Sequence, residues 1–264
     1  MEKIAIIGGG NLGSSLAEGF LRSGKVKAAD MVVTRRRTHL LEKLEARNIP
    51  IGSNNADAVK QAEIIILCVK PMQAELVLEE LSPVLDPSKH ILVSAVTGLS
   101  SHDIRKWTRE VPLFRVMPNT AVSINESMTC IAFRKESETH SEKVIALFSL
   151  LGRTMVINEE LMEASTVLAA CGIAYALRFL RAMTQGGIEI GFSSEMAQLI
   201  ASQTLRGAAG LVLDTGNHPE KEIDKVTTPM GVTISGLNEM EHNGFSSALI
   251  KGIMISYKKI ESPK

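Results

Sequence analysis

The sequence predicts an α/β protein in which a doubly wound, mostly parallel sheet is followed by an all-α domain. Three observations support this fold class. Short apolar runs alternate with helical patterns up to residue 157, several of these runs are continuously apolar, and no strand-like run appears after residue 158. Strands that alternate with helices are typical of parallel sheets covered by helices on both faces. We therefore expect a sheet domain over residues 1–157 and a helical domain over residues 158–264.

The expected strands are short apolar runs bounded by turn residues. Residues 64–69 (Ile-Ile-Ile-Leu-Cys-Val) show no polar alternation, which indicates a strand buried on both faces. The full set of expected strands is Ile4–Ile7, Met31–Thr34, residues 64–69, Ile91–Ser94, residues 113–116, residues 130–133 and residues 155–157.

Long helical patterns make up the second domain, at residues 159–185, 193–213 and 236–255. Residues 164–176 are apolar nearly all round their helix, so this helix should be fully buried. A helical unit of about a hundred residues has little interior of its own. We therefore expect the second domain to bury this surface in a homodimer, with further assembly left open.

The composition excludes several classes of partner. Lys plus Arg equal Asp plus Glu at 29 each, so there is no basic excess for binding nucleic acid. The 6 His and 3 Cys are scattered without the spacing of metal ligands, and no metal site is expected. The N-terminus lacks the pattern of a signal peptide, and the uncharged stretch that ends at Leu177 is too short to span a bilayer. We expect a cytoplasmic protein without a membrane partner.

A glycine-rich turn follows the first expected strand and precedes a helical pattern. The run Gly8-Gly9-Gly10-Asn11-Leu12-Gly13 fits G-x-G-x-x-G in this context. The first glycine permits a tight turn, the second lets the backbone approach a pyrophosphate, and the third lets helix and strand pack closely. The motif predicts a Rossmann-type dinucleotide-binding domain. A glycine-rich turn without a ligand is the alternative.

The second expected strand ends in basic residues. An NAD site usually carries Asp or Glu there to bind the ribose 2′-hydroxyl, whereas this chain has Thr34-Arg35-Arg36-Arg37. Guanidinium groups suit the 2′-phosphate of NADP, so the sequence predicts NADPH in preference to NADH. The alternative is that these arginines are solvated charges at a basic helix start, and of the three Arg37 fits this alternative best.

A second anion site is predicted near the C-terminus. The run Thr227-Thr228-Pro229-Met230-Gly231-Val232-Thr233 has the pattern of a tight turn that opens a helix. The first N–H groups of a helix lack partners and its dipole is positive there, so this turn should attract a small carboxylate. A dinucleotide site combined with a carboxylate site predicts hydride transfer to a small acid.

These motifs and their order resemble pyrroline-5-carboxylate reductase over nearly the whole chain. The V-K-P, M-P-N-T and late T-P-x-G-x-T motifs are much more specific than the glycine-rich loop. The matching stretches are residues 6–13, Cys68-Val69-Lys70-Pro71, Arg115-Val116-Met117-Pro118-Asn119-Thr120, residues 160–162, residues 172–175, His218-Pro219, residues 226–233 and Gly244-Phe245. The resemblance implies an oxidoreductase that reduces 1-pyrroline-5-carboxylate to L-proline with NADPH, the last step of proline biosynthesis. It also implies pairing through the helical domain and an active site between the two domains.

The resemblance also implies roles for individual residues. The cofactor-binding residues would be Gly8, Gly10, Asn11, Leu12 and Gly13 at the pyrophosphate, Thr34, Arg35, Arg36 and Asn55 near the adenosine ribose and its phosphate, Val69, Lys70, Pro71 and Ala95 along the groove, and Glu159 at the nicotinamide end. The substrate carboxylate would lie on Gly231, Val232 and Thr233, with Lys225 as an added cation beside it.

Thr233 is the expected catalytic residue, because its hydroxyl would face the imine nitrogen. A threonine hydroxyl is a poor acid, so we expect it to donate a hydrogen bond or to relay a proton through water. An ordinary first-turn helix threonine is the alternative reading of this residue.

Two departures from the family pattern leave alternatives open. Met230 replaces the first of two glycines, and would be strained by about 1–2 kcal/mol if its φ is positive. Residues 170–173 (Ala-Cys-Gly-Ile) replace a segment rich in Ser, Gly and Pro. One alternative is a reductase of the same fold that acts on another small imino acid or on a 2-hydroxy acid. The other is a non-catalytic NADP-binding protein.

Overall fold

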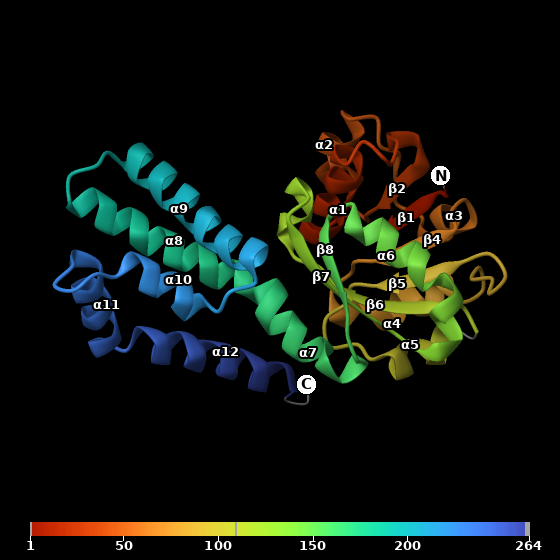
Figure 1. Ribbon diagram of the computed structural model, residues 1–264. Coiled ribbons are helices and arrows are strands. Elements are labelled where there is room, and N and C mark those ends of the chain that lie inside the picture. The colour runs from red at the N-terminus through yellow and green to blue at the C-terminus, as the bar shows by residue number, and fades with distance from the viewer. Residues whose placement is uncertain (1, 109, 262–264) are drawn as a thin grey trace. The chain divides into compact units, whose positions relative to one another are not determined.

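The computed structural model describes residues 2–108 and 110–261. Residues 1, 109 and 262–264 lie outside this part, and they include the outer bounds of the two expected domains. The contacts divide the chain into one unit of Met1–Cys171 with Ile260–Lys264 and a second unit of Gly172–Lys259 (Figure 1). The boundary expected at residue 157 falls where the last strand ends, and the assignment of two functional domains stays a prediction.

The first unit is built on an eight-stranded sheet with the order β3-β2-β1-β4-β5-β6-β7-β8. All neighbours from β3 to β6 are parallel, β7 is antiparallel to β6, and β8 is parallel to β7. The doubly wound, mostly parallel sheet is therefore confirmed. The strands are β1 (Ile4–Ile7), β2 (Met31–Thr34), β3 (Ile51–Gly52), β4 (Ile64–Leu67), β5 (Ile91–Ser94), β6 (Leu113–Met117), β7 (Ser127–Phe133) and β8 (Gly152–Val156).

Helices cover both faces of this sheet, which explains the continuously apolar strands. In β1, Ile4 and Ile6 pack into a cluster with residues of α1, α2 and α6, while Ala5 and Ile7 pack into a second cluster with residues of α3, α4 and α5. Each side chain of the strand therefore meets an apolar layer. The α-helices of this unit are α1 (Asn11–Arg22), α2 (Glu42–Glu45), α3 (Asn55–Lys60), α4 (Pro71–Leu81), α5 (Ser101–Thr108), α6 (Ser141–Ser149) and α7 (Met162–Ser165).

The second unit is helical, as expected, but it contains more helices than the sequence predicted. Its helices are α8 (Gly172–Glu189), α9 (Ser194–Thr215), α10 (Pro219–Val226), α11 (Val232–His242) and α12 (Phe245–Glu261). The single helix expected at residues 236–255 is wrong, because Gly244 has a φ of 79° and separates α11 from α12. The short α10 was missed.

Residues 162–189 form one helical run, in which a π-helical segment, Thr166–Cys171, joins α7 to α8. This segment includes part of the departure from the family pattern at residues 170–173. π-Helical turns are rare and often occur at functional sites.

The apolar helix expected to be fully buried is not buried within one chain. Leu168 is 70% exposed and Leu177 is 57% exposed, and Leu199 of α9 is 71% exposed. This exposed apolar surface fits the expectation of a second copy, which would bury it. The run Glu159–Glu189 is also long and apolar enough to cross a membrane by length and composition alone, a test that core helices of soluble proteins pass as well.

Candidate functional site

Most of the expected cofactor residues follow strands that end at the same edge of the sheet. β1, β2, β4 and β5 are parallel neighbours, so their carboxyl ends share one edge. We call this the nucleotide edge. The strand order reverses between β1 and β4, and in open α/β sheets a ligand binds outside the carboxyl ends at such a switch point. The expected residues that lie just beyond this edge are Gly8, Gly10, Asn11, Leu12, Gly13, Arg35, Arg36, Val69, Lys70, Pro71 and Ala95.

The glycine-rich loop, residues 8–13, together with the start of α1 forms the candidate pyrophosphate site, which we call the cradle. The N–H groups of Gly8 and Gly9 both donate to the carbonyl of Thr34, at 3.1 and 2.7 Å. Gly8 has a φ of 105°, and a β-carbon there would lie 2.7 Å from the carbonyl oxygen of Cys68. Apart from the adjoining backbone, no described atom lies within 4 Å of where a β-carbon of Gly10 would be. The loop is therefore fixed against the sheet at Gly8 and open at Gly10.

The start of α1 completes this cradle. Gly10 is the N-cap residue and has no side chain to cap the helix, and the first turn contains no acidic residue. The unpaired N–H groups and the positive end of the dipole therefore favour an anion. At Gly13 a β-carbon would collide with the carbonyl oxygen of Gly8, so only glycine allows helix and loop to pack this closely. The residues fit a dinucleotide pyrophosphate.

The four expected cofactor residues at the end of β2 and the start of α3 differ in the contacts that they make. Arg35 donates from Nη1 to the carbonyl of Gly9 at 2.9 Å, so it braces the glycine-rich loop. Thr34 is buried, and its hydroxyl donates to Oδ1 of Asn55 at 2.6 Å. Asn55 in turn donates to Glu80 at 3.0 Å. Arg36 is exposed. Arg37 is exposed as well, so the 2′-phosphate role of Arg36 stays a prediction.

The loops after β4 and β5 border the cradle. The N–H of Cys68 donates to the carbonyl of Ile7 at 2.8 Å, and that of Ala95 donates to the carbonyl of Leu67 at 2.9 Å. Lys70 is exposed and is the N-cap of α4, where Pro71 occupies the first turn. Pro is tolerated in this position because its missing N–H would be unpaired in any case. Ala95, and Cys68 just before Val69, are therefore held by backbone bonds to the neighbouring parallel strands.

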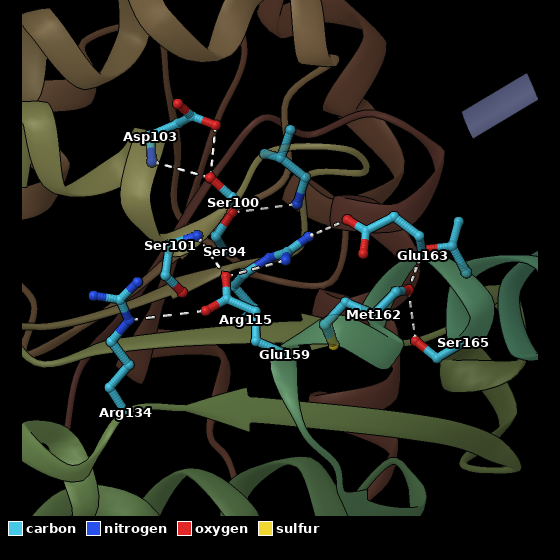
Figure 2. Close-up of polar contacts among 12 residues, drawn as sticks. Ser94, Ser100, Ser101, Asp103, Arg115, Arg134, Glu159, Met162, Glu163 and Ser165 are labelled. Atoms are coloured by element: carbon cyan, nitrogen blue, oxygen red, sulfur yellow. Dashed lines mark hydrogen bonds and ion pairs between the residues drawn. The ribbon is translucent and has the colours of Figure 1, made fainter. Parts of the chain in front are cut away.

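A buried arginine beside this edge was missed by the sequence reasoning. Arg115 lies within β6 in register with Ser94 of β5, and its side chain is only 3% exposed. Its Nη1 lies 3.2 Å from Oε1 of Glu159, and its Nη2 lies 3.2 Å from Oε1 of Glu163 (Figure 2). An arginine within the apolar run Leu-Phe-Arg-Val-Met was the available signal, because a buried charge requires a partner.

Glu159 joins this cluster to α5. Its Oε1 also accepts the backbone N–H of Ser101 at 2.6 Å, and Nε of Arg134 lies 3.9 Å from its Oε2. Burial opposes ionisation, but hydrogen bonds from Ser101 and the charge of Arg115 outweigh it and hold the pKa of Glu159 below its usual value. The carboxylate thus has structural partners. Its contact with a nicotinamide stays a prediction.

The expected carboxylate site is the turn at residues 227–233 in the second unit, and its backbone has a positive φ at Met230. The N–H of Gly231 donates to the carbonyl of Thr228 at 2.9 Å, with Pro229 and Met230 between them. Met230 has a φ of 60° and is fully exposed, so the positive φ considered from the sequence is confirmed. Pro in the second position and a positive φ in the third are typical of a type II turn, which normally requires glycine there.

Helix α11 begins directly after this turn. Gly231 is its N-cap and has no side chain to cap the helix, while Val232 is 91% exposed. Thr233 is exposed in the first turn. The first N–H groups of α11 are therefore presented to solvent, as a site for a small carboxylate requires.

Lys225 is less available than expected. It lies in the last turn of α10, where its Nζ bonds both carboxylate oxygens of Glu222 at 2.7 and 2.8 Å. The Lys225 and Asn217 hydrogen bonds hold the pKa of Glu222 below its usual value. A role beside the substrate carboxylate stays a prediction for Lys225. Within the described ranges, no group of three or more His, Cys, Asp or Glu is placed to hold a metal ion.

Two known protein families match different parts of this chain, one in the sheet unit and the other from Glu159 onward. Residues 3–98 match the family described as NADP oxidoreductase, coenzyme F420-dependent. Residues 159–262 match the family described as pyrroline-5-carboxylate reductase dimerisation.

Individual relatives match nearly the whole chain. Pyrroline-5-carboxylate reductase 2 of Dictyostelium discoideum is 41% identical over 98% of this chain and 92% of its own length. Pyrroline-5-carboxylate reductase 1 of the same organism is 44% identical over 98% of this chain, which spans only 49% of that longer protein. The crystal structure of a Plasmodium falciparum pyrroline carboxylate reductase with NADP bound superposes with a TM-score of 0.88, at 25% identity, over 98% of this chain and 97% of that one.

Proposed function

Because this chain belongs to the pyrroline-5-carboxylate reductase family, we propose that it reduces 1-pyrroline-5-carboxylate to L-proline, the last step of proline biosynthesis. One observation carries this proposal above the others. The same chain has a glycine-rich loop that is open at Gly10, at the start of α1, and a start of α11 that no side chain caps. An imino acid reductase needs one site for the hydride donor and one for the carboxylate of its substrate.

The cofactor is NADP, with NADPH used in preference to NADH. The match of residues 3–98 to an NADP oxidoreductase family and the NADP-bound relative support binding of NADP. Exposed Arg36 and the absence of an acid at the end of β2 in the sequence support the preference for the phosphorylated cofactor. The pyrophosphate would lie against the backbone of Gly8 and Gly10, whose N–H groups are bonded within the fold, and would be held by the N–H groups of Asn11 and Leu12. The groove of Val69, Lys70, Pro71 and Ala95 lies beside it.

The reaction requires little acid–base chemistry from the protein. The reduced nicotinamide supplies the hydride when it is bound. A cyclic imine protonated at nitrogen already has an electrophilic C=N carbon, so orientation of this carbon dominates the rate. The carboxylate would lie at Gly231 and be held by the N–H groups of Val232 and Thr233, because the N–H of Gly231 is bonded to Thr228. The Thr233 hydroxyl would donate to the ring nitrogen or relay a proton to it through water. Glu159 is expected toward the nicotinamide end, and Thr34 and Asn55 near the adenosine ribose.

The working protein is a homodimer, and further assembly is left open. The exposed apolar residues of the second unit, and the dimerisation family that residues 159–262 match, support pairing through this unit. A cytoplasmic location belongs to the same proposal, in which a partner protomer rather than lipid covers the apolar helical run.

Substrate profiling tests this function against its rivals. Purified protein is given NADPH with the cyclic imine, with other small imino acids or with the keto forms of 2-hydroxy acids, and kcat/KM is compared. A preference of about a hundredfold for another acid, equal to about 2.7 kcal/mol, would remove proline synthesis from contention. Intact NADPH binding with no reduction of any acid would favour a non-catalytic NADP-binding protein.

A further inference from the structure

We propose that Glu159 is a positioning residue for the cofactor, acting through the loop between β5 and α5, residues 95–100. In this inference Glu159 need not touch NADPH. It holds the N-terminus of α5, and thereby the far end of a loop that borders the nucleotide edge. The inference rests on the proposed function in one respect, because it takes that edge as the NADPH site.

The far end of the loop is held by a contact that is distant in sequence. Ser101 is the first residue of α5, and its N–H is one of the orphan donors of a helix start. Its acceptor is Oε1 of Glu159, at 2.6 Å (Figure 2). A carboxylate in this position pairs the donor and also complements the helix dipole. Loss of the carboxylate would leave the end of the loop without this anchor.

The near end of the loop is held independently. Ala95 donates its N–H to the carbonyl of Leu67, and Val96 donates to the hydroxyl of Ser94 at 3.4 Å. Both residues are buried, whereas Gly98 is exposed and has a φ of 68°. Releasing Ser101 should therefore loosen residues 97–101 while β5 and Ala95 stay in place.

Arg115 holds Glu159 against the sheet and supplies a matched control. Its two terminal nitrogens each bind one carboxylate at 3.2 Å, and the side chains of Glu159 and Glu163 are 29% and 27% exposed. The two acids share one guanidinium and nearly equal burial. The N–H of Ser101 donates to Glu159 and not to Glu163. Glu159 also lies 3.9 Å from Nε of Arg134, which adds to its structural contacts but not to the nucleotide edge. A purely structural role of the cluster would leave NADPH affinity equal in variants of the two acids, and a positioning role would not.

The experiment compares Glu159→Ala with Glu163→Ala in the full-length protein. Both variants lose one ion pair to Arg115, so both should lower the Tm. Only Glu159→Ala should raise the NADPH dissociation constant, by about tenfold, or about 1.4 kcal/mol, in a fluorescence titration. Glu163→Ala should stay within about twofold of wild type on the same scale. Glu159→Gln should recover most of the affinity, because its side-chain oxygen can still accept from Ser101.

Amide hydrogen exchange without cofactor separates positioning from direct contact. Glu159→Ala should speed exchange in peptides that cover residues 97–101, and Glu163→Ala should not. If Glu159→Ala does not fold, Ser101→Pro removes both the N–H and the hydroxyl with which Ser101 bonds Glu159, at a helix position that tolerates Pro, and should weaken NADPH binding equally. Equal NADPH affinity in both alanine variants, or weakened affinity with unchanged exchange, would overturn the inference.

The same titrations separate this inference from the proposed function. Wild-type protein that binds NADPH but does not reduce the imine would contradict the function only, because the dissociation constants still decide the role of Glu159. Wild-type protein that does not bind NADPH would overturn both.

Discussion

The N–H of Gly231 donates to the carbonyl of Thr228 at 2.9 Å, and this bond closes the turn that opens α11. The two residues are also in tight contact, since a β-carbon on Gly231 would lie 2.5 Å from the Thr228 hydroxyl oxygen. Met230 between them has a φ of 60°. The close contact with Thr228 therefore requires a glycine at position 231. At position 230 the backbone has a positive φ, which strains methionine but would not strain glycine. Backbone strain of this kind persists at functional sites when the surroundings hold it.

Met230→Gly should stabilise the protein. Glycine removes about 1–2 kcal/mol of strain but adds chain entropy to the unfolded state, worth about 0.4–1 kcal/mol, so the net gain is on the order of 1 kcal/mol. Urea unfolding measures it, with Met230→Ala as the control that removes the side chain but keeps the strained backbone. Equal stability of the Gly and Ala variants would show that the strain is absent.

Thr233→Ala should lower turnover of the imine by about tenfold to a hundredfold, because it removes the donor to the ring nitrogen. NADPH affinity should stay nearly unchanged, since the cradle lies at the start of α1. Ser235→Ala is the control on the same helix, where the hydroxyl donates to the carbonyl of Gly231 at 3.4 Å. Steady-state kinetics and NADPH titration together decide, and a parallel loss of turnover and affinity would count against the assigned role.

Arg36→Ala should weaken NADPH by about tenfold or more and leave NADH nearly unaffected, because a charge-assisted bond to the 2′-phosphate is lost. Arg37→Ala, which changes a neighbouring exposed arginine, serves as the control. Arg35→Ala should weaken both cofactors, because Arg35 also braces the loop at Gly9. Dissociation constants for NADPH and NADH measure these effects, and equal weakening of both by Arg36→Ala would contradict the phosphate assignment.

Asp103 should make a pH-dependent contribution to stability at the start of α5. Its Oδ2 accepts from Ser100 Oγ at 2.6 Å, and its N–H donates back to that hydroxyl at 3.1 Å, which forms a capping box. Hydrogen bonds from Lys106 and Ser100 lower the pKa of Asp103 from 3.8 to about 2. Because the pKa of Asp103 is lower in the folded than in the unfolded state, its carboxylate stabilises the fold at pH values above the pKa of the unfolded state. This stabilisation is lost as the pH falls through the pKa of the folded state.

Asp103→Asn measures this contribution. The side chain is 43% exposed, so the difference from wild type should be under about 1 kcal/mol at neutral pH. The difference should shrink as the pH falls from about 4 to about 2, and urea unfolding at several pH values follows it. Lys89→Gln, on the loop before β5, changes a charge elsewhere and serves as the control. A difference that is independent of pH would contradict the capping role.

The sheet was largely predictable because its strands are buried on both faces. β1, β2 and β5 have the expected bounds, and each is a run without polar interruption that helices cover on two sides. β3 was missed because Ile51–Gly52 is only two residues long and carries no periodic pattern. β7 begins earlier than expected, at Ser127, because buried hydroxyls there are paired with each other and with backbone rather than excluded from the sheet.

The local conformations of the candidate site were predictable from the sequence, whereas most side-chain contacts that depend on the tertiary fold were not. The glycine-rich loop and the turn before α11 are contiguous in sequence, so their conformations follow from their own residues. Arg115 and Glu159 lie far apart in sequence and meet only because β6 and the segment after β8 pack on one face. The pairing of Lys225 with Glu222 is an exception: it is local, at i, i+3 spacing on α10, and this spacing was an available signal that was not used.

The central claim is that this chain converts a cyclic imine to proline with NADPH as the donor. The most direct measurement follows NADPH absorbance and proline formation together, in one reaction of purified protein with 1-pyrroline-5-carboxylate. The account predicts that NADPH is consumed and that each NADPH oxidised yields one proline. Protein that binds NADPH yet forms no proline, while the imine remains, would contradict it.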